Sequence, residues 1–411
     1  MLEFNFQKTE LPNGLKIITE KISGIKSIAL GVWVQVGARD ESESNNGISH
    51  FVEHILFKGT VNRTTKQIAE SMEYVGGSLD AFTAKEVTCY SAHFLDEHLP
   101  LAVDVLSDII QNSLFEEAEI AKEKDVIQQE IYHYQDTPEE VIFEFFYNDI
   151  FEKHPLGYNI YGTLENVKNF SRDELIDFVD NNYTSDRMLI TASGNVNHQE
   201  LVDLVSRAFR NIGKNSARRF LPAKLGSAHH HKIDYACSQA HICMGTRGIQ
   251  YNSPQRYPLM VVHMLLGGGM SSRLFQKIRE EHGLAYTVFS FNDLFFDTGV
   301  FGVYLETDKE SFNKAIDLIK REFITLFNDK ITEDELIKIK QQLKGSFILS
   351  LENTFTRMNR LAEMQMYLDH FNSYEDVIRN INAITAEQVR QISENLFKDD
   401  KFYLTYLNPE S

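Results

Sequence analysis

The clearest hydrophobic pattern in the chain lies over positions 27–36, where a large aliphatic residue occupies every second position. These aliphatic residues are Ile28, Leu30, Val32, Val34 and Val36. A period of two predicts a β-strand with one buried face. A second strand is predicted over residues 15–20, directly after a Pro-Asn-Gly turn.

After the first long strand the apolar positions recur with the period of a helix. The segment 47–56 is predicted to be helical and follows a polar loop, in which Asn45 or Asn46 is the expected N-cap. The other elements predicted in the first half are strands over 78–84, 87–93 and 188–194, and helices over 65–75, 98–111, 116–153 (split near Pro138), 172–181 and 199–212.

The second half of the chain repeats this order of elements. A strand, a helix, a glycine break, a helix, two strands and long helices follow one another there as they do over residues 27–150. We therefore predict an α+β fold of two duplicated domains, each a mixed, mostly antiparallel sheet packed with helices. The predicted boundaries are 1–212 for the first domain, 213–232 for an interdomain linker and 233–411 for the second domain.

The predicted linker lacks a hydrophobic period and carries three consecutive histidines, His229, His230 and His231. Such a tract can bind a metal ion adventitiously, but it is more often a solvated linker. We interpret it here as solvated linker.

Composition is that of a folded protein and excludes several classes of function. Hydrophobic residues make up 43% of the chain, and no apolar run approaches the ~20 residues that span a membrane. The net charge of −18 argues against binding to nucleic acid and favours cationic partners if acidic residues line a cavity. No signal peptide is visible, so a cytoplasmic location is expected. The three cysteines form no disulfide framework or metal motif.

The candidate chemistry lies in the predicted helix over 47–56. On a helix, His50 and His54 are four positions apart and Glu53 is three from His50, so the three side chains share one face. Two imidazoles at this spacing can bind one zinc ion, and the neighbouring carboxylate is placed to act on water. The order His-x-x-Glu-His is the inverse of the more common zinc-protease motif. Chance can produce the same letters on an ordinary helix, so further ligands are needed.

A catalytic zinc site usually takes three protein ligands and leaves a fourth position open. The carboxylate-rich segment 116–153 offers Glu130, and Glu123 lies seven residues earlier on nearly the same helical face. A residue at the second position can hydrogen-bond a ligand histidine. Spacing alone does not decide which of the two carboxylates is the ligand.

Several separated motifs in the same order give the chain a resemblance to the inverted-motif zinc peptidases. This family includes pitrilysin, insulin-degrading enzyme and mitochondrial processing peptidase, and the chain is most similar to its short bacterial processing-peptidase-like members. The resemblance covers essentially the whole chain. Its motifs are the segments 11–15, 47–60, 76–83, 123–130, 272–275 and 279–286.

The resemblance implies roles for the residues of the metal half. His50, His54 and Glu130 would hold one Zn²⁺ per chain, Glu53 would be the general base and Glu123 a supporting carboxylate. In the second half, laying His263 on His54 places apolar residues at the other two motif positions, so that half is expected to lack the metal site.

The resemblance also implies substrate contacts. Arg279 and Tyr286 match a pair from the non-metal half that contacts the substrate near the scissile bond, with Tyr286 placed to stabilise an oxyanion. A glycine-rich loop at Gly267, Gly268 and Gly269 would also contact substrate; it lacks the Gly-Lys-Ser/Thr ending of a phosphate loop. The peptide is expected to pair with an edge strand formed by Ser78, Leu79, Asp80, Ala81, Phe82 and Thr83.

The resemblance predicts a zinc metalloendopeptidase that hydrolyses unstructured peptides, basic or presequence-like, inside an enclosed chamber. We expect a homodimer in which Arg279 and Tyr286 act in trans on the zinc site of the partner chain. Two alternatives stay open at this point. One is a non-catalytic scaffold relative of the same family, and the other is a zinc amidohydrolase acting on small peptides.

Overall fold

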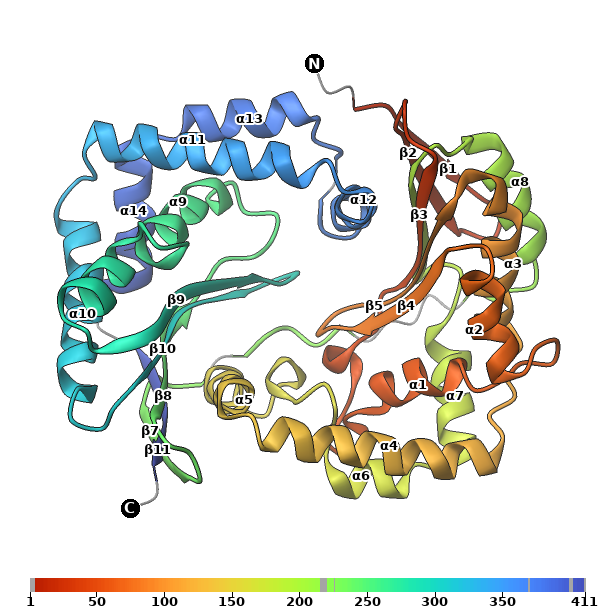
Figure 1. Ribbon diagram of the computed structural model, residues 1–411, viewed down its shortest axis with the longest axis horizontal. Coiled ribbons are helices and arrows are strands. Elements are labelled where there is room, and N and C mark those ends of the chain that lie inside the picture. The colour runs from red at the N-terminus through yellow and green to blue at the C-terminus, as the bar shows by residue number, and fades with distance from the viewer. Residues whose placement is uncertain (1–3, 215–219, 225, 369, 399–401, 410–411) are drawn as a thin grey trace. The chain divides into compact units, whose positions relative to one another are not determined.

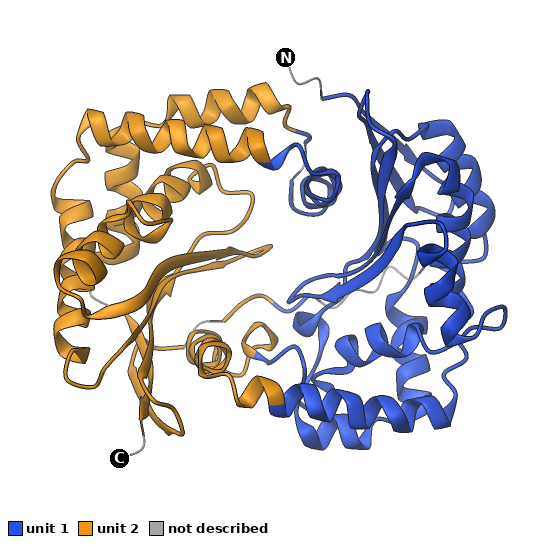
Figure 2. Cartoon of the chain, viewed as in Figure 1, with its two compact units in different colours: residues 1–132, 158–221, 350–371 blue, residues 133–157, 222–349, 372–411 orange. Residues whose placement is uncertain are grey.

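The computed structural model describes residues 4–214, 220–224, 226–368, 370–398 and 402–409. The chain forms two compact units, drawn in blue and orange in Figure 2. Unit 1 comprises residues 1–132, 158–221 and 350–371, and unit 2 comprises residues 133–157, 222–349 and 372–411. Each unit is built around one β-sheet with helices packed on it, as Figure 1 shows.

The sheet of unit 1 has six strands within the described residues, in the order β1-β2-β6-β3-β5-β4. Neighbouring strands are antiparallel except β2 and β6, which are parallel. The strands in that order are β1 (Phe6–Glu10), β2 (Lys16–Lys21), β6 (Met188–Gly194), β3 (Ser27–Val34), β5 (Thr88–Leu95) and β4 (Ser78–Thr83). The helices of this unit are α1 (Ile48–Leu56), α2 (Thr65–Glu73), α3 (Leu99–Gln111), α4 (Glu117–Gln135, in unit 1 as far as Tyr132), α6 (Leu164–Asn169), α7 (Arg172–Asn182), α8 (His198–Ala208) and α12 (Thr354–Tyr367).

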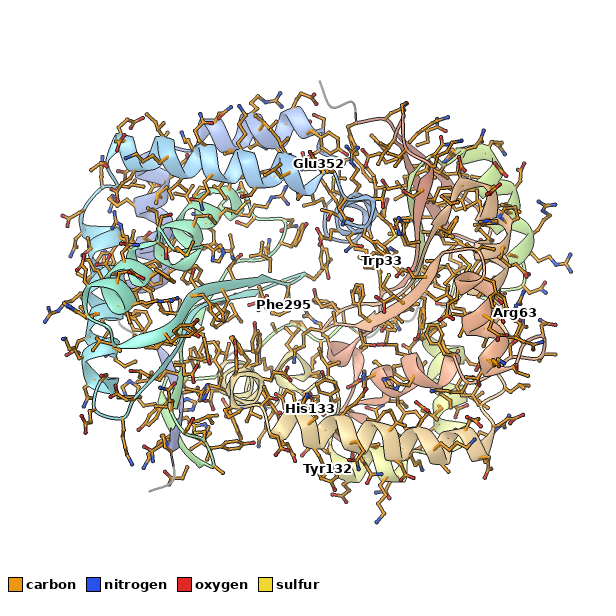
Figure 3. The ribbon with its side chains drawn as sticks, viewed as in Figure 1. Trp33, Arg63, Tyr132, His133, Phe295 and Glu352 are labelled. Atoms are coloured by element: carbon orange, nitrogen blue, oxygen red, sulfur yellow. The ribbon has the colours of Figure 1, made fainter. Side chains whose placement is uncertain are left out.

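Strand β3 is buried on both faces, whereas the sequence pattern predicted one buried face. The apolar residues at even positions, from Ile28 to Val36, are buried in one cluster with helices α1, α3 and α8. Trp33 belongs to the opposite face, which α12 covers with Met358 (Figure 3). A buried ion pair between Arg357 on α12 and Glu20 on β2 fastens this helix, with 2.7 Å between Nη1 and Oε1.

Unit 2 has the same topology with one strand fewer. Within the described residues its sheet has five strands, in the order β7-β11-β8-β10-β9, and only β7 and β11 are paired in parallel. The strands in that order are β7 (His230–Tyr235), β11 (Tyr403–Pro409), β8 (Ala240–Arg247), β10 (Gly299–Thr307) and β9 (Ala285–Leu294). Its helices are α5 (Pro138–Phe151), α9 (Arg256–Gly267), a π-helix (Phe275–Glu281), α10 (Phe312–Asn328), α11 (Glu333–Ser350), α13 (Tyr374–Ala383) and α14 (Ala386–Phe397).

The strands β7, β11, β8, β10 and β9 therefore correspond to β2, β6, β3, β5 and β4, which confirms the predicted duplication and fold class. Each unit also contains one helix from the other half of the sequence. The helix α5 packs on β8 and β11 in unit 2, and α12 packs on β2, β3 and β6 in unit 1. The boundaries at 212 and 232 stay a prediction about the sequence repeats, because packing groups the chain differently.

Several details differ from the sequence-based expectations. Strand β1 was not predicted, and β7 begins at His230, inside the predicted linker. The long helical stretch at the end of the chain is divided into α12, α13 and α14. None of the described helices is both long enough and apolar enough to cross a membrane. Cys89 and Cys243 are buried, and Cys237 is half-buried.

Candidate metal centre

The first turn of α1 is held by a carboxylate that is distant from the expected cap. The expected N-caps Asn45 and Asn46 do not cap the helix; the N-cap is Gly47, with φ of +96° and no side-chain bond. The buried carboxylate of Glu41 instead accepts hydrogen bonds of 2.9 Å from the backbone N–H groups of Gly47 and Ser49. A negative charge at a helix N-terminus is favourable. Burial raises the pKa of Glu41, and these hydrogen bonds oppose the rise.

A second loop presses against the start of α1. A Cβ atom at Gly47 would lie 2.7 Å from both the Cα of Gly162 and the carbonyl oxygen of Tyr161, so this close approach requires glycine. The Tyr161 ring meets the His50 ring edge to face, with centroids 5.0 Å apart. The orientation of His50 is therefore fixed by packing from outside its own helix.

The structure brings together His50, His54 and Glu130. One potential ligand atom from each residue lies within 4.8 Å of the other two. The Oε2 atom of Glu130, on α4, lies 3.8 Å from Nε2 of His50 and 3.6 Å from Nε2 of His54. Ligand atoms around a tetrahedral zinc ion are roughly 3.4 Å apart. The three residues therefore have the spacing of a zinc site.

The carboxylate of Glu130 is suited to hold a cation. Its Oε2 atom is buried and has no hydrogen-bond partner among the described residues, although it points between two imidazoles. Burial, together with the neighbouring His54, lowers the pKa of His50 to about 3. His50 is therefore neutral at pH 7 and has a lone pair to donate. Two imidazole nitrogens and a carboxylate oxygen suit zinc.

Glu123 contacts Nδ1 of His54, the ring nitrogen opposite the one that Glu130 approaches. Its Oε2 atom lies 3.2 Å from Nδ1 of His54, and its Oε1 atom lies 2.8 Å from Nζ of Lys58. A carboxylate at Nδ1 holds the proton there and leaves Nε2 free to bind a metal. Burial raises the pKa of Glu123, but the bonds from His54 and Lys58 outweigh it and the net pKa is lowered. Glu130 therefore lies beside the Nε2 atoms that face one another, and Glu123 contacts the other ring nitrogen of His54.

His54 itself carries a raised pKa. Burial lowers this pKa, but the hydrogen bond to Glu123 and the charge of Glu130 outweigh burial. The negative charges around His54 therefore favour a cation at this point.

Glu53 lies on the same helix, half-buried, and faces strand β4. The hydroxyl of Thr83 donates a hydrogen bond to its Oε2 atom. Burial raises the pKa of Glu53, the bond from Thr83 opposes the rise, and the charges of Glu130 and Asp80 add to it. A carboxylate with a raised pKa is suited to accept and return a proton near neutral pH.

Strand β4 lies at the edge of its sheet, and the described residues pair it only with β5. Its side chains alternate. Leu79 and Ala81 pack against the core that contains α1, whereas Phe82 meets Trp33 edge to face on the other side of the sheet. Its exposed positions are Ser78, Asp80 and Phe82. The outer backbone edge of β4 is therefore available for pairing with an extended peptide.

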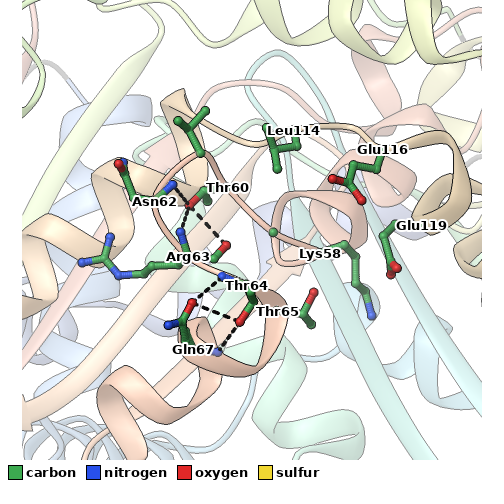
Figure 4. Close-up of a pocket in the computed structure, with 12 residues that line it drawn as sticks. Lys58, Thr60, Asn62, Arg63, Thr64, Thr65, Gln67, Leu114, Glu116 and Glu119 are labelled. Carbon is green, nitrogen blue, oxygen red and sulfur yellow. Dashed lines mark hydrogen bonds between the residues drawn. The ribbon is translucent and has the colours of Figure 1, made fainter.

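A separate pocket of about 350 Å³ lies beside the loop after α1, and none of the predicted zinc residues lines it. Figure 4 shows Lys58 on the side of this pocket where Glu116 and Glu119 also lie. Buried Asp108 holds the loop through hydrogen bonds of 2.7 Å from both Thr60 and Arg63. We assign this loop a structural role, because it carries the lysine that contacts Glu123.

The residues predicted in the second half meet one another within unit 2. The Arg279 guanidinium lies 4.5 Å above the ring of Tyr286, which is 75% exposed at the edge strand β9. At the glycine loop, a Cβ on Gly267 would lie 2.1 Å from the backbone nitrogen of Ser290, so packing alone requires glycine there. The substrate roles of these residues stay predictions.

The positions matched to the metal motif in unit 2 lie on α9. Leu259 and Val262 are buried apolar residues, and Nδ1 of His263 lies 2.8 Å from the Ser290 hydroxyl. Helix α9 therefore corresponds to α1, but apolar residues stand at the positions of His50 and Glu53.

Three residues of the site were not found from the sequence. Lys58 lies four positions after His54, so helical spacing could have indicated it. Glu41 and Tyr161 contact α1 from loops, and no period connects them to the motif.

Comparison with known proteins agrees with this geometry. Residues 16–164 match the family described as "Insulinase (Peptidase family M16)", and residues 169–343 match "Peptidase M16 inactive domain". The chain is 37% identical over 399 residues to an uncharacterized zinc protease, YmxG, of Bacillus subtilis, and the match covers 97% of each chain.

Two solved structures share the fold. One is a protease from Helicobacter pylori, with a TM-score of 0.92, 21% identity, and coverage of 99% of this chain and 100% of that chain. The other is described as a peptidase M16 inactive domain from Pseudomonas fluorescens, with a TM-score of 0.92, 19% identity and 99% coverage of both chains. At these identities the similarity establishes the fold alone.

Proposed function

The chain belongs to the insulinase family of peptidases, M16, and we propose that it is a zinc-dependent metalloendopeptidase that cleaves extended peptides. One observation carries the proposal. Nε2 of His50, Nε2 of His54 and Oε2 of Glu130 converge around one point, and Glu53 stands on the same helix as the two histidines. A relative that serves only as a scaffold has no need of all four side chains.

The chain's own residues divide the reaction among them. Zinc held by His50, His54 and Glu130 would supply Lewis acidity toward a peptide carbonyl and toward water. Glu53 accepts the proton of the attacking water at its carboxylate and returns it to the leaving amine. The raised pKa of Glu53 supports this double role, because it makes the carboxylate a stronger proton acceptor, and the acid so formed can give the proton to the more basic leaving amine.

Substrate selection follows from the edge strand. A peptide that adds to β4 pairs through its backbone, so recognition is largely independent of sequence and requires an extended chain. Folded proteins should therefore resist cleavage. The net charge of −18 favours basic peptides.

We further propose that two copies of the chain enclose the substrate in a chamber and that Arg279 and Tyr286 act on the partner's zinc site. Their side chains support this role, because a stacked cation and phenol are exposed on the edge strand of unit 2. Such a pair can contact a peptide backbone and an oxyanion.

The test is a cleavage assay on an unstructured basic peptide with the zinc-loaded chain. We expect cleavage that a chelator abolishes and that zinc restores. The variant Glu53→Gln should lose about 10²- to 10⁴-fold in kcat while it keeps its zinc. Cleavage that persists in chelator, or no cleavage by the zinc-loaded chain, would overturn the proposal.

The same assay separates the alternatives. A non-catalytic scaffold would bind zinc and cleave nothing. A hydrolase of small amides would prefer dipeptides to peptides of about ten or more residues, whereas addition to β4 favours the longer substrates because they make more backbone bonds.

A further inference from the structure

A second group of metal-binding side chains lies in unit 2, within the histidine tract interpreted above as solvated linker. Potential ligand atoms of Asp149, His229 and His231 all lie within 4.8 Å of one another. Oδ1 of Asp149 lies 3.0 Å from Nδ1 of His231 and 3.2 Å from Nε2 of His229. These separations are close to the roughly 3.4 Å between ligands of a tetrahedral zinc ion.

Backbone structure brings the three residues together. His229 and His231 stand two positions apart where the chain enters β7, so their side chains point to the same side, and that of His230 points to the other. Asp149 comes from α5, which packs on the neighbouring strand β11. Thr405, paired with His231 across β7 and β11, donates a hydrogen bond of 2.5 Å to Oδ2 of Asp149. The carboxylate is therefore oriented with Oδ1 toward the histidines.

The hydrogen bonding of His229 directs its other ring nitrogen to Asp149. Its Nδ1 atom lies 2.9 Å from the carbonyl oxygen of Ser227, and a carbonyl can only accept, so Nδ1 carries a proton. In the neutral ring the Nε2 atom then presents a lone pair to the Asp149 carboxylate. A proton on Nε2 or a metal ion between the two groups satisfies this contact, and a metal ion would satisfy the contact of His231 with the same carboxylate as well. Metal-bound histidines commonly donate their other N–H to a backbone carbonyl in this way.

We propose that Asp149, His229 and His231 form a second site for a divalent metal ion of the zinc type, which fastens α5 to the sheet of unit 2. Two imidazoles and one carboxylate suit zinc, cobalt or nickel. The histidine side chains are 46% and 40% exposed, which leaves the remaining coordination to water. The chain would then bind two metal ions instead of the one predicted from its sequence.

The structural role follows from the equivalent place in unit 1. There, α12 is fastened to β2 by the buried ion pair of Arg357 and Glu20. In unit 2 the corresponding contact joins α5 to β7 through Asp149 and His231. A metal ion would replace the charge that the arginine supplies in unit 1, and it would stabilise this unit without any part in catalysis.

The experiment measures zinc binding in a His50→Ala/His54→Ala background, in which the first site is lost. By equilibrium dialysis we expect about one zinc ion per chain, against about two in the wild type. Adding His229→Gln/His231→Gln should abolish this binding, whereas His230→Gln, a change in the same tract, should leave it unchanged.

Asp149→Asn distinguishes a built site from a histidine tract that chelates adventitiously. It keeps an acceptor for Thr405 but loses the charge, and we expect zinc affinity to fall at least about tenfold. Zinc should also raise the Tm of the background variant and leave that of the Asp149→Asn variant unchanged. Equal binding with and without Asp149→Asn, or equal loss in His230→Gln, would overturn the proposal. If the background variant does not fold, comparing two zinc ions in the wild type with one in Asp149→Asn decides the same question.

Discussion

The hydroxyl of Thr83 donates a hydrogen bond to the Glu53 carboxylate and thereby joins the end of edge strand β4 to the helix that carries His50 and His54. The bond fixes the proposed base relative to the strand on which a peptide would lie. Loss of this hydrogen bond should therefore change both the pKa of Glu53 and the orientation of its carboxylate.

Replacing Thr83 by valine should shift the acid limb of the pH–activity profile upward. Glu53 acts as a base only when it is ionised, and the bond from Thr83 opposes the rise in its pKa caused by burial. Without this bond the pKa rises further, so activity is lost at a higher pH as the solution is acidified. A hydrogen bond to a charged group contributes about 1.5–3 kcal/mol, so we expect a shift of about one to two pH units.

The control is Thr83→Ser, which keeps the hydroxyl. Its kcat–pH profile should overlay that of the wild type within a few tenths of a unit. An unchanged acid limb in Thr83→Val would show that the hydroxyl does not tune Glu53.

Replacing Glu123 by glutamine should weaken zinc binding without removing a ligand. The carboxylate fixes the proton of His54 on Nδ1, and the loss of such a partner typically costs about 10- to 100-fold in metal affinity. The change Glu130→Gln should cost more, because it removes a ligand. Competition with a chromophoric zinc chelator measures both, and Glu117→Gln on the exposed face of α4 is the matched control. A larger loss for Glu123→Gln than for Glu130→Gln would reverse the assignment of the two carboxylates.

Replacing Glu41 by alanine should destabilise unit 1. The change leaves buried donors on Gly47, Ser49 and Asn46 without their acceptor, and each such donor costs about 1–3 kcal/mol. Removal of the buried Glu41 carboxylate also relieves its own desolvation penalty, so we expect a net loss of about 2–4 kcal/mol in the free energy of unfolding, measured by urea denaturation.

Zinc affinity should fall together with stability, because Glu41 holds the turn that presents His50. The neighbouring Glu43 is exposed, and Glu43→Ala should stay within about 0.5 kcal/mol of the wild type. Equal effects of the two changes would contradict the role of Glu41 as the cap of α1.

The parts of the fold that follow a local period were predictable from the sequence. The alternation at Ile28 to Val36 indicated that these side chains share one buried face of β3, but not that the opposite face is buried too. The repeated order of elements indicated two similar units. The exchange of α5 and α12 was not predictable. An amphipathic pattern shows that a helix has a buried face, but it does not show which sheet that face covers.

The same distinction applies to the site. The spacing of His50, Glu53 and His54 was enough to place them on one helical face. The choice between Glu123 and Glu130 depended on how α4 packs across α1, and spacing left it open. Glu41 and Tyr161 act through contacts between distant loops. The histidine tract was interpreted as solvated linker because its partner, Asp149, lies 80 residues earlier.

The proposed action of Arg279 in trans can be tested by complementation between two inactive variants. Glu53→Gln lacks the base and Arg279→Ala lacks the substrate contact, so each homodimer should be nearly inactive. In a mixed dimer, one composite site combines an intact Glu53 from one chain with an intact Arg279 from the other. Random pairing at equal amounts makes half of the dimers mixed, with one active site of two, so about a quarter of wild-type activity should return.

Co-expression of the two variants with different affinity tags provides the mixed dimers, and light scattering checks that they are dimeric. The double variant Glu53→Gln/Arg279→Ala, co-expressed with wild type, calibrates how far the chains exchange. If Arg279 acts within its own chain, the mixture cannot exceed its more active parent. A mixture no more active than that parent, although mixed dimers are present, would therefore assign Arg279 to the zinc site of its own chain.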